Sequence, residues 1–106
     1  MNRITIKRVA VGYRTWVNNN VEVYSDGETM RDAISNLVFS QRDIIFQEPT
    51  ILTVSKRDID FIAYKSSDKR CWGTGKTETK AIANLIFDFP HQMGFKLDFI
   101  LKIAEV

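Results

Sequence analysis

The feature that most constrains this chain is an internal repeat. Residues 25–39 and 73–87 align without a gap at an offset of 48 positions, which is the distance from Thr29 to Thr77. The identical pairs are Gly27/Gly75, Thr29/Thr77, Ala33/Ala81, Ile34/Ile82, Asn36/Asn84, Leu37/Leu85 and Phe39/Phe87. Because a repeated sequence indicates a repeated structural unit, we predict a fold built from two similar halves.

The same offset relates a longer part of the chain. Residues 1–48 pair with residues 49–96, and apolar positions correspond at Ile6/Val54, Tyr13/Phe61, Trp16/Tyr64, Val23/Cys71 and Tyr24/Trp72. A chain of 106 residues is long enough to bury one core without disulfides or metal ions. We therefore predict a single domain, residues 1–106, made of two repeats (1–48 and 49–96) and a C-terminal strand over 97–105.

Alternating apolar residues predict the strands of each repeat. Ile4 and Ile6 alternate with polar residues, and the apolar side then moves to odd positions, Val11 among them. Such a shift requires a bend, bulge or turn near Arg8. In the second repeat the shift falls at the turn sequence 55–58, after which Ile59, Phe61 and Ala63 continue the apolar side. Residues 18–20 and 66–68 predict second turns, followed by short strands over 21–24 and 69–72.

Each repeat then predicts a helix. Thr29 and Thr77 are suitable N-caps, because a threonine hydroxyl accepts a hydrogen bond from the first helical turn. One face of each helix is mainly apolar, formed by Met30, Ala33, Ile34, Leu37, Val38 and Gln41 in the first and by Ala81, Ile82, Leu85, Ile86 and Phe89 in the second. Pro90 is expected to end the second helix, and residues 42–48 and 91–94 are expected to be connectors.

The tail predicts one more strand, because its odd positions are apolar: Phe95, Leu97, Phe99, Leu101 and Ile103. Apolar residues at 100 and 104 leave a helical reading open. The sum is an α+β fold, βββα-βββα-β, with an antiparallel sheet and two helices on one face. The pattern does not determine the order of the strands.

The sequence Gly75-Lys76-Thr77 invites comparison with a phosphate-binding loop. That loop needs a further glycine at position 70, where this chain has Arg70. The corresponding segment of the first repeat, residues 26–29, is acidic and would repel phosphate. We therefore interpret residues 75–77 as a tight turn and N-cap.

Residue types suited to catalysis are scarce. His91 is the only histidine and Cys71 the only cysteine, so the chain has no Cys/His cluster for zinc. Cys71 corresponds to Val23, and we expect it inside the sheet as a small apolar residue. Asp58 and Asp60 are expected to be solvated turn carboxylates. We expect no enzyme activity, no cofactor and no metal.

Basic residues near Trp72 suggest a binding surface. They are Lys65, Lys69, Arg70, Lys76 and Lys80, and a second group contains Arg3, Lys7, Arg8 and Arg14. Basic residues beside an exposed aromatic ring can bind nucleic acid through phosphate contacts and base stacking. The alternative is a solvated polar face with Trp72 buried, which the aromatic Tyr24 at the corresponding position favours.

Phe39 and Phe87 lie about 180° from the apolar face of their helices, at about 100° per residue. Three explanations are open. Each ring packs under the following connector, or the two helices bury these faces against each other, or the rings contact a partner.

The strands and the helix start resemble a known family. The residues are Gly27-Glu28-Thr29 with Ala33, Ile34 and Asn36, and Gly75-Lys76-Thr77 with Ala81, Ile82 and Asn84. This pattern resembles the partial RNase-H-like domain of HicB-type antitoxins. The resemblance implies three strands, a helix and a fourth strand, with a non-catalytic role in masking a toxin nuclease. This chain carries two such units and no recognisable helix-turn-helix or ribbon DNA-binding segment.

Together these patterns predict a small cytoplasmic interaction protein. It would bind and inhibit another macromolecule such as a toxin, nuclease or host-defence complex, as phage or mobile-element proteins of the anti-CRISPR type do. The alternative is a nucleic-acid-binding protein, to which the net charge of +2 is only weakly suited. A third reading is a subunit that adds an edge strand to an assembly, and a homodimer is compatible with the pattern. No membrane partner is expected. Candidate partner-binding residues are Lys65, Lys69, Arg70, Trp72, Lys76, Lys80, Arg8, Phe39 and Phe87.

Overall fold

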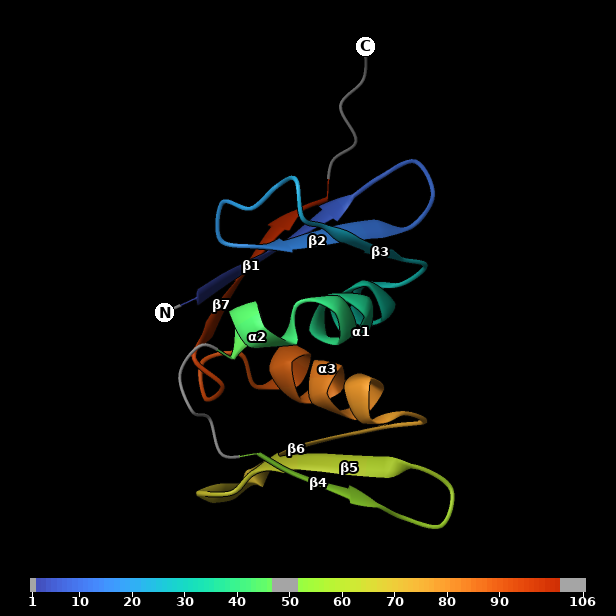
Figure 1. Cartoon of the computed structure of the whole chain (residues 1–106), viewed down its shortest axis with the longest axis vertical. Helices are drawn as coiled ribbons and strands as arrows, with labels where there is room; N and C mark the ends of the chain where they lie inside the picture. The colour runs from blue at the N-terminus through green and yellow to red at the C-terminus, as the bar shows by residue number, and fades with distance from the viewer. Residues whose placement is uncertain (1, 47–51, 102–106) are drawn as a thin grey trace.

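Two β-sheets enclose a pair of helices in the computed structural model of this protein, which describes residues 2–46 and 52–101 (Figure 1). The first sheet has the strand order β3-β2-β1-β7, and the second has the order β4-β5-β6. The strands are β1 (Asn2–Arg8), β2 (Tyr13–Val17), β3 (Ser25–Gly27), β4 (Leu52–Lys56), β5 (Phe61–Lys65), β6 (Asp68–Gly75) and β7 (Phe95–Ile100). The helices are α1 (Met30–Ser40), α2 (Arg42–Ile45) and α3 (Glu78–Asp88). The fold is α+β.

The expectation of one sheet with two helices on a single face is wrong. Helix α1 packs on β2 and β3, helix α3 packs on β5 and β6, and the two helices pack on each other. Ser35 of α1 and Ala83 of α3 are buried, although neither belongs to the predicted apolar face. Small residues there let the helices approach closely, so each helix buries one side on its own sheet and another side on its partner.

The repeat is matched in part. Strands β2 and β5 coincide at the offset of 48, as do helices α1 and α3. The third strands differ, because β3 has 3 residues and β6 has 8. The predicted strand over 21–24 is wrong, since that segment is an exposed loop and β3 begins at Ser25.

The two helices begin with the same contacts. The hydroxyls of Thr29 and Thr77 accept hydrogen bonds from the backbone N–H groups of Asp32 (3.0 Å) and Lys80 (3.1 Å). The segment 75–77 is thus a helix start, as predicted. A Cβ atom added at Gly75 would lie 2.7 Å from the backbone nitrogen of Ala81, so the close approach of strand and helix requires glycine.

Replacing Thr77 by alanine is expected to lower the free energy of unfolding by about 1 kcal/mol, because the N–H of Lys80 loses its acceptor. Urea unfolding followed by circular dichroism measures the change. Thr77→Ser keeps the hydroxyl and should retain most of the stability. Equal losses in the two variants would contradict a capping role.

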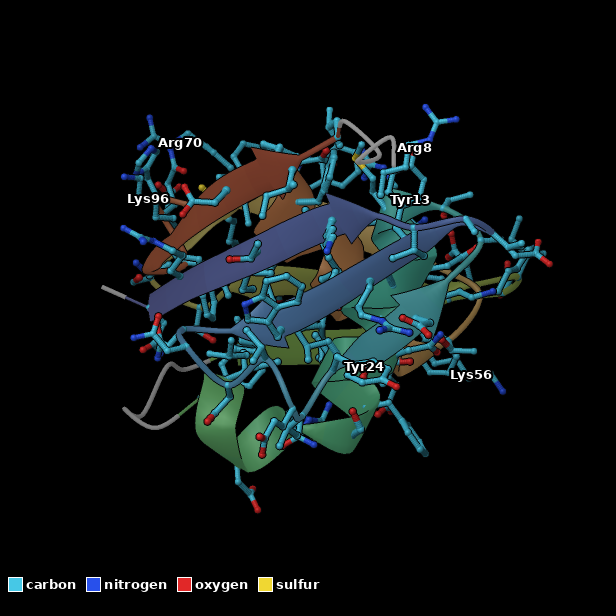
Figure 2. The ribbon with its side chains drawn as sticks, turned by 90° about the horizontal axis from the view of Figure 1, so that it is seen from above. Arg8, Tyr13, Tyr24, Lys56, Arg70 and Lys96 are labelled. Atoms are coloured by element: carbon cyan, nitrogen blue, oxygen red, sulfur yellow. The ribbon has the colours of Figure 1, made fainter. Side chains whose placement is uncertain are left out.

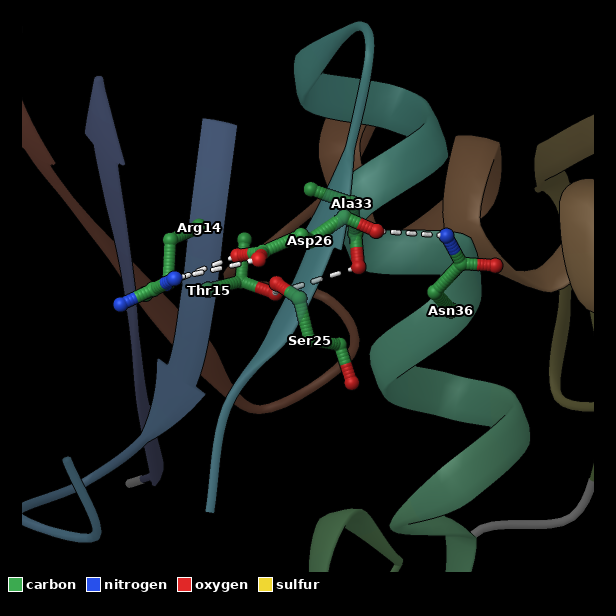
Figure 3. A network of polar contacts seen from close by, with 6 residues as sticks. All are labelled: Arg14, Thr15, Ser25, Asp26, Ala33 and Asn36. Atoms are coloured by element: carbon green, nitrogen blue, oxygen red, sulfur yellow. Dashed lines mark hydrogen bonds and ion pairs between the residues drawn. The ribbon is translucent and has the colours of Figure 1, made fainter. Parts of the chain in front are cut away.

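Polar contacts hold the short strand β3 against its neighbours (Figure 3). The buried Thr15 hydroxyl lies 3.1 Å from the carbonyl oxygen of Ala33 and 3.3 Å from that of Ser25, and its single proton can bond one of them at a time. The side-chain amide of Asn36 donates to the carbonyl oxygen of Asp26 at 2.7 Å. Asn84 donates to Thr74 at 2.6 Å in the second repeat, so both helices fasten the strand before them.

The turns and connectors depart from the predicted pattern in two places. Val11 and Ile59 were expected on the apolar side of strands, but both lie in exposed turns, and Val11 is 86% exposed. The turn near Arg8 is present as predicted. The expected connector 42–48 contains the helix α2, and residues 47 and 48 lie outside the described part. Residues 91–94 form turns, and α3 ends before Pro90, as predicted.

The C-terminal segment is a strand over Phe95–Ile100, which decides against the helical reading there. The predicted bounds of 97–105 are wrong, because the strand starts two residues earlier and ends before Leu101. Residues 102–105 lie outside the described part. Strand β7 pairs with β1 in parallel, with Ile4 opposite Leu97 and Ile6 opposite Phe99. The sheet is therefore not purely antiparallel. Local patterns cannot reveal this pairing, because residues 9–94 lie between the two strands.

Candidate binding surface

The outer face of the second sheet presents two aromatic side chains side by side. Tyr64 of β5 is paired with Trp72 of β6. Their neighbours Ala63 and Cys71 are buried in the core, so alternation along each strand directs Tyr64 and Trp72 outward. Trp72 is 51% exposed, so the expectation that it is buried is wrong.

These two rings belong to a shallow depression of about 330 Å³. Its lining residues are Arg57, Ile62, Tyr64, Lys69 and Trp72. We call this set the aromatic face. It combines apolar surface with cationic groups and is open to solvent, so it is suited to contact with a macromolecule.

Carboxylates hold one arginine of the aromatic face, Arg57, and a second arginine on the same strand as Trp72, Arg70. Arg57 donates two hydrogen bonds to Asp60, from Nε to Oδ1 and from Nη2 to Oδ2, each 2.7 Å long. The Nε atom of Arg70 lies 3.0 Å from Oδ1 of Asp68. These hydrogen bonds lower the pKa of Asp60 and of Asp68 and raise those of the arginines. Because the carboxyl pKa is lowered, each ion pair is fully formed at pH values above the ordinary pKa of an aspartate. It is lost as the pH falls through the lowered pKa and the carboxylate is protonated. Near neutral pH both pairs are therefore formed, and because the Arg70 side chain is 90% exposed, water screens the charge of its pair strongly.

The predicted basic cluster around Trp72 is assembled only in part. Lys69 lines the same depression as Trp72, and Arg70 is highly exposed on the same strand. The ammonium group of Lys65 instead donates to the carbonyl oxygen of Gln92 at 2.9 Å. Lys76 and Lys80 are exposed at the start of α3, and Lys76 is close enough to Asp60 to lower the pKa of that carboxyl.

Arg8 belongs to the other sheet. Figure 2 places Arg8 and Arg70 on opposite sides of the molecule. In the group that contains Arg8, Arg3 pairs with Asp98 at 2.8 Å and Arg14 pairs with Asp26 at 2.8 Å.

The Arg14 guanidinium also stacks on the Tyr24 ring, 3.7 Å from its centroid. Tyr24 is the counterpart of Trp72 in the first repeat, and this stacking engages its ring within the chain.

A second hollow has a volume of about 400 Å³ and lies along the edge of β6 that pairs with no described strand. It is lined by Arg31, Trp72, Gly73, Thr74, Asn84, Asp88 and Phe89. Arg31 reaches across from α1 to bond Asn84 at 2.9 Å and Asp88 at 2.7 Å. Trp72 lines both hollows and is the residue they share.

Phe39 and Phe87 have different environments despite their equivalent positions. Phe39 is 79% exposed, so neither packing under a connector nor burial between the helices describes it. Phe87 is partly buried, with the ring of Phe99 at 6.5 Å between centroids and the Arg31 guanidinium at 4.5 Å. Sequence alone could not distinguish these two residues.

Residues suited to chemistry are not brought together in the described part of the chain. Cys71 is buried in the sheet, as predicted, and His91 is exposed in a turn. Residues 2–46 and 52–101 contain no group of three or more His, Cys, Asp or Glu side chains that could hold a metal ion. No helix in these ranges is long and apolar enough to span a membrane.

Sequence reasoning missed three members of the aromatic face: Arg57, Ile62 and Tyr64. A signal was present, because Phe61 and Ala63 were expected on the apolar side of β5. Alternation then places Ile62 and Tyr64 on the opposite side. Comparison with protein-family models, with curated proteins and with solved structures found no match to this chain.

Proposed function

We propose that this chain is a non-enzymatic binding protein that inhibits another protein by covering it, and that it docks through the aromatic face. The observation that carries the proposal is the outward Tyr64–Trp72 pair, bordered by Arg57 and Lys69. Tryptophan, tyrosine and arginine are the residue types that most often dominate the free energy of protein–protein binding.

Charge favours a protein over a nucleic acid as the ligand. Arg57 and Arg70 are each paired with an aspartate, so two of the cations close to Trp72 are partly neutralised, whereas Lys69 has no ion pair among the described residues. Binding to a phosphate backbone needs cations that can replace counterions. A protein surface, by contrast, accommodates paired charges around an apolar centre.

The resemblance to HicB-type antitoxins supports the kind of target that we propose. Both G-x-T segments start helices of 11 residues, and both threonines act as N-caps. We propose that an ancestral unit was duplicated and that the target is a toxin, a nuclease or a host-defence complex in the cytoplasm. This role requires a shaped surface and no catalytic group.

The test is capture of partners from native cells on immobilised protein, after treatment with nuclease. We expect the double variant Tyr64→Ser/Trp72→Ser to lose the protein partner that the natural chain retains. Tyr24→Ser is the matched control, because it removes an exposed aromatic side chain at the position equivalent to Trp72. Equal capture by the natural chain and the double variant would refute docking through the aromatic face.

A second candidate function is binding of single-stranded nucleic acid. Two adjacent rings on a sheet can stack on bases, and Lys69 has no ion pair within the described residues. Titration of tryptophan fluorescence with an oligothymidylate tests it. Steep weakening of binding with added salt, together with loss in Trp72→Ala, would support this function. Absence of quenching at low salt would eliminate it.

A further inference from the structure

The two halves of the molecule differ in how their sheets end. Strand β7 covers the edge of β1 in the first sheet. Strand β4 is the counterpart of β1 in the second sheet. It pairs with β5 on one side and with no described strand on the other. Within residues 2–46 and 52–101, the first sheet thus has four strands and the second has three.

The two equivalent phenylalanines differ in the same sense. The ring of Phe87 is met edge-on by Phe99, a β7 side chain, at 6.5 Å and an interplanar angle of 83°. Arg31 covers another part of that ring. Phe39, by contrast, remains 79% exposed.

The contacts between the helices indicate that these two environments are counterparts. Ser35 of α1 donates to Thr79 of α3 at 3.3 Å. At the offset of 48, Ser35 corresponds to Ala83 and Thr79 corresponds to Arg31. Arg31 donates a hydrogen bond to Asn84, the residue after Ala83. From these contacts at equivalent positions we infer an approximate two-fold axis between the helices.

Strand β7 lies beside β1 and contacts Phe87. The two-fold axis relates this position to one beside β4 and next to Phe39. Thr79, which stands in the place of Arg31, has a side chain too short to cover the ring as a guanidinium does. Phe39 therefore has neither a described strand equivalent to β7 nor a side chain equivalent to Arg31 to cover it.

We propose that the β4 edge and Phe39 form a docking site for an extended segment of another protein. The segment adds in parallel to β4, as β7 adds to β1, and backbone hydrogen bonds hold it there. In the first sheet Ile4 lies opposite Leu97 and Ile6 lies opposite Phe99. At the offset of 48, Leu52 corresponds to Ile4 and Val54 corresponds to Ile6. The segment therefore carries an apolar residue opposite Leu52 and an aromatic residue opposite Val54, the latter on Phe39.

Charge adds one preference. Lys56 is exposed at the end of β4 toward which a parallel segment would run, so an acidic residue is favoured at the C-terminal end of the segment.

The occupant is a foreign segment because the chain's own β7 is committed. Phe95 begins β7 and is 2% exposed in the core, so a second copy cannot lend this strand without opening its first sheet. The site lies at the β4 edge of the second sheet, whereas β6 forms the other edge. Neither Phe39 nor a β4 residue lines the aromatic face. The inference therefore stands independently of the proposed function.

The test is an NMR titration of ¹⁵N-labelled protein with a synthetic peptide of the β7 sequence, Phe-Lys-Leu-Asp-Phe-Ile, extended by one glutamate. We expect saturable shifts in the amides of Leu52–Lys56 and near Phe39. Phe39→Ala should weaken binding at least about tenfold, because the segment's aromatic residue loses its apolar partner. A peptide methylated at alternate backbone nitrogens should not bind, because it cannot form the strand ladder.

Val11→Ala is the matched control, since it truncates an exposed apolar side chain in a remote turn. The melting temperature of Phe39→Ala should equal that of the natural chain, which separates binding from folding. The proposal is overturned by the absence of saturation, by shifts confined to β1 and β7, or by equal affinity in Phe39→Ala. A dimer in sedimentation that Phe39→Ala dissociates would instead assign the site to a second copy and overturn the foreign segment.

Discussion

Phe95→Ala is expected to lower the free energy of unfolding by about 3–5 kcal/mol, the range for removing a buried phenylalanine. Phe95 is 2% exposed, and its ring meets Phe46 edge-on at 6.3 Å. It also begins β7, opposite Asn2 of β1. The substitution therefore opens a cavity and loosens the only parallel pair among the described strands. Urea unfolding monitored by far-ultraviolet circular dichroism measures the loss.

Phe99→Ala is the control for this prediction. Phe99 lies on the same strand but is about half exposed, so its truncation should cost less than half as much. Equal losses for the two variants would show that β7 is not anchored through Phe95.

Gly73→Val is expected to cost about 3 kcal/mol, at the upper end of the range for overpacking. A Cβ at this position of β6 would collide with the backbone nitrogen of Leu85 and lie 2.7 Å from the carbonyl oxygen of Ala81. Both atoms belong to the backbone of α3, so no side chain can rotate to make room. The helix must move away from the sheet, and this exposes part of the core.

Differential scanning calorimetry is a direct measure of this second effect. Arg70→Ala serves as the control, because it alters a highly exposed side chain on the same strand and should change stability by less than about 0.5 kcal/mol. A melting temperature of Gly73→Val equal to that of Arg70→Ala would contradict the close approach of β6 and α3.

Local chemistry made the helices predictable. Thr29 and Thr77 cap them, the apolar residues lie at helical spacing, and α3 ends before Pro90. The placement of the helices between two sheets was not predictable, because it depends on Ser35 and Ala83, whose small size carries no distinctive signal. The parallel pairing of β1 and β7 was likewise hidden, since it joins segments that share no local pattern.

The aromatic face could have been derived more fully from the sequence. Placing Cys71 inside the sheet already implies that Trp72 points outward. The comparison with Tyr24 favoured the wrong answer, because Tyr24 lies in an exposed loop before β3 and not in a strand. The exposure of Phe39 had a different cause. Its counterpart Phe87 is met by Phe99 of β7 and Phe39 has no such contact among the described residues, a difference that only the three-dimensional arrangement reveals.

The pairing of β1 with β7 also has a consequence for the order of folding. Strands β4, β5 and β6 are joined by short turns, so their contacts are local and can form early. Ile4 meets Leu97 only after the second repeat has been made and has brought β7 back to β1. During synthesis the edge of β1 therefore stays unpaired until β7 has emerged from the ribosome. In this interval, chaperones can bind the exposed edge, or the edge can start aggregation.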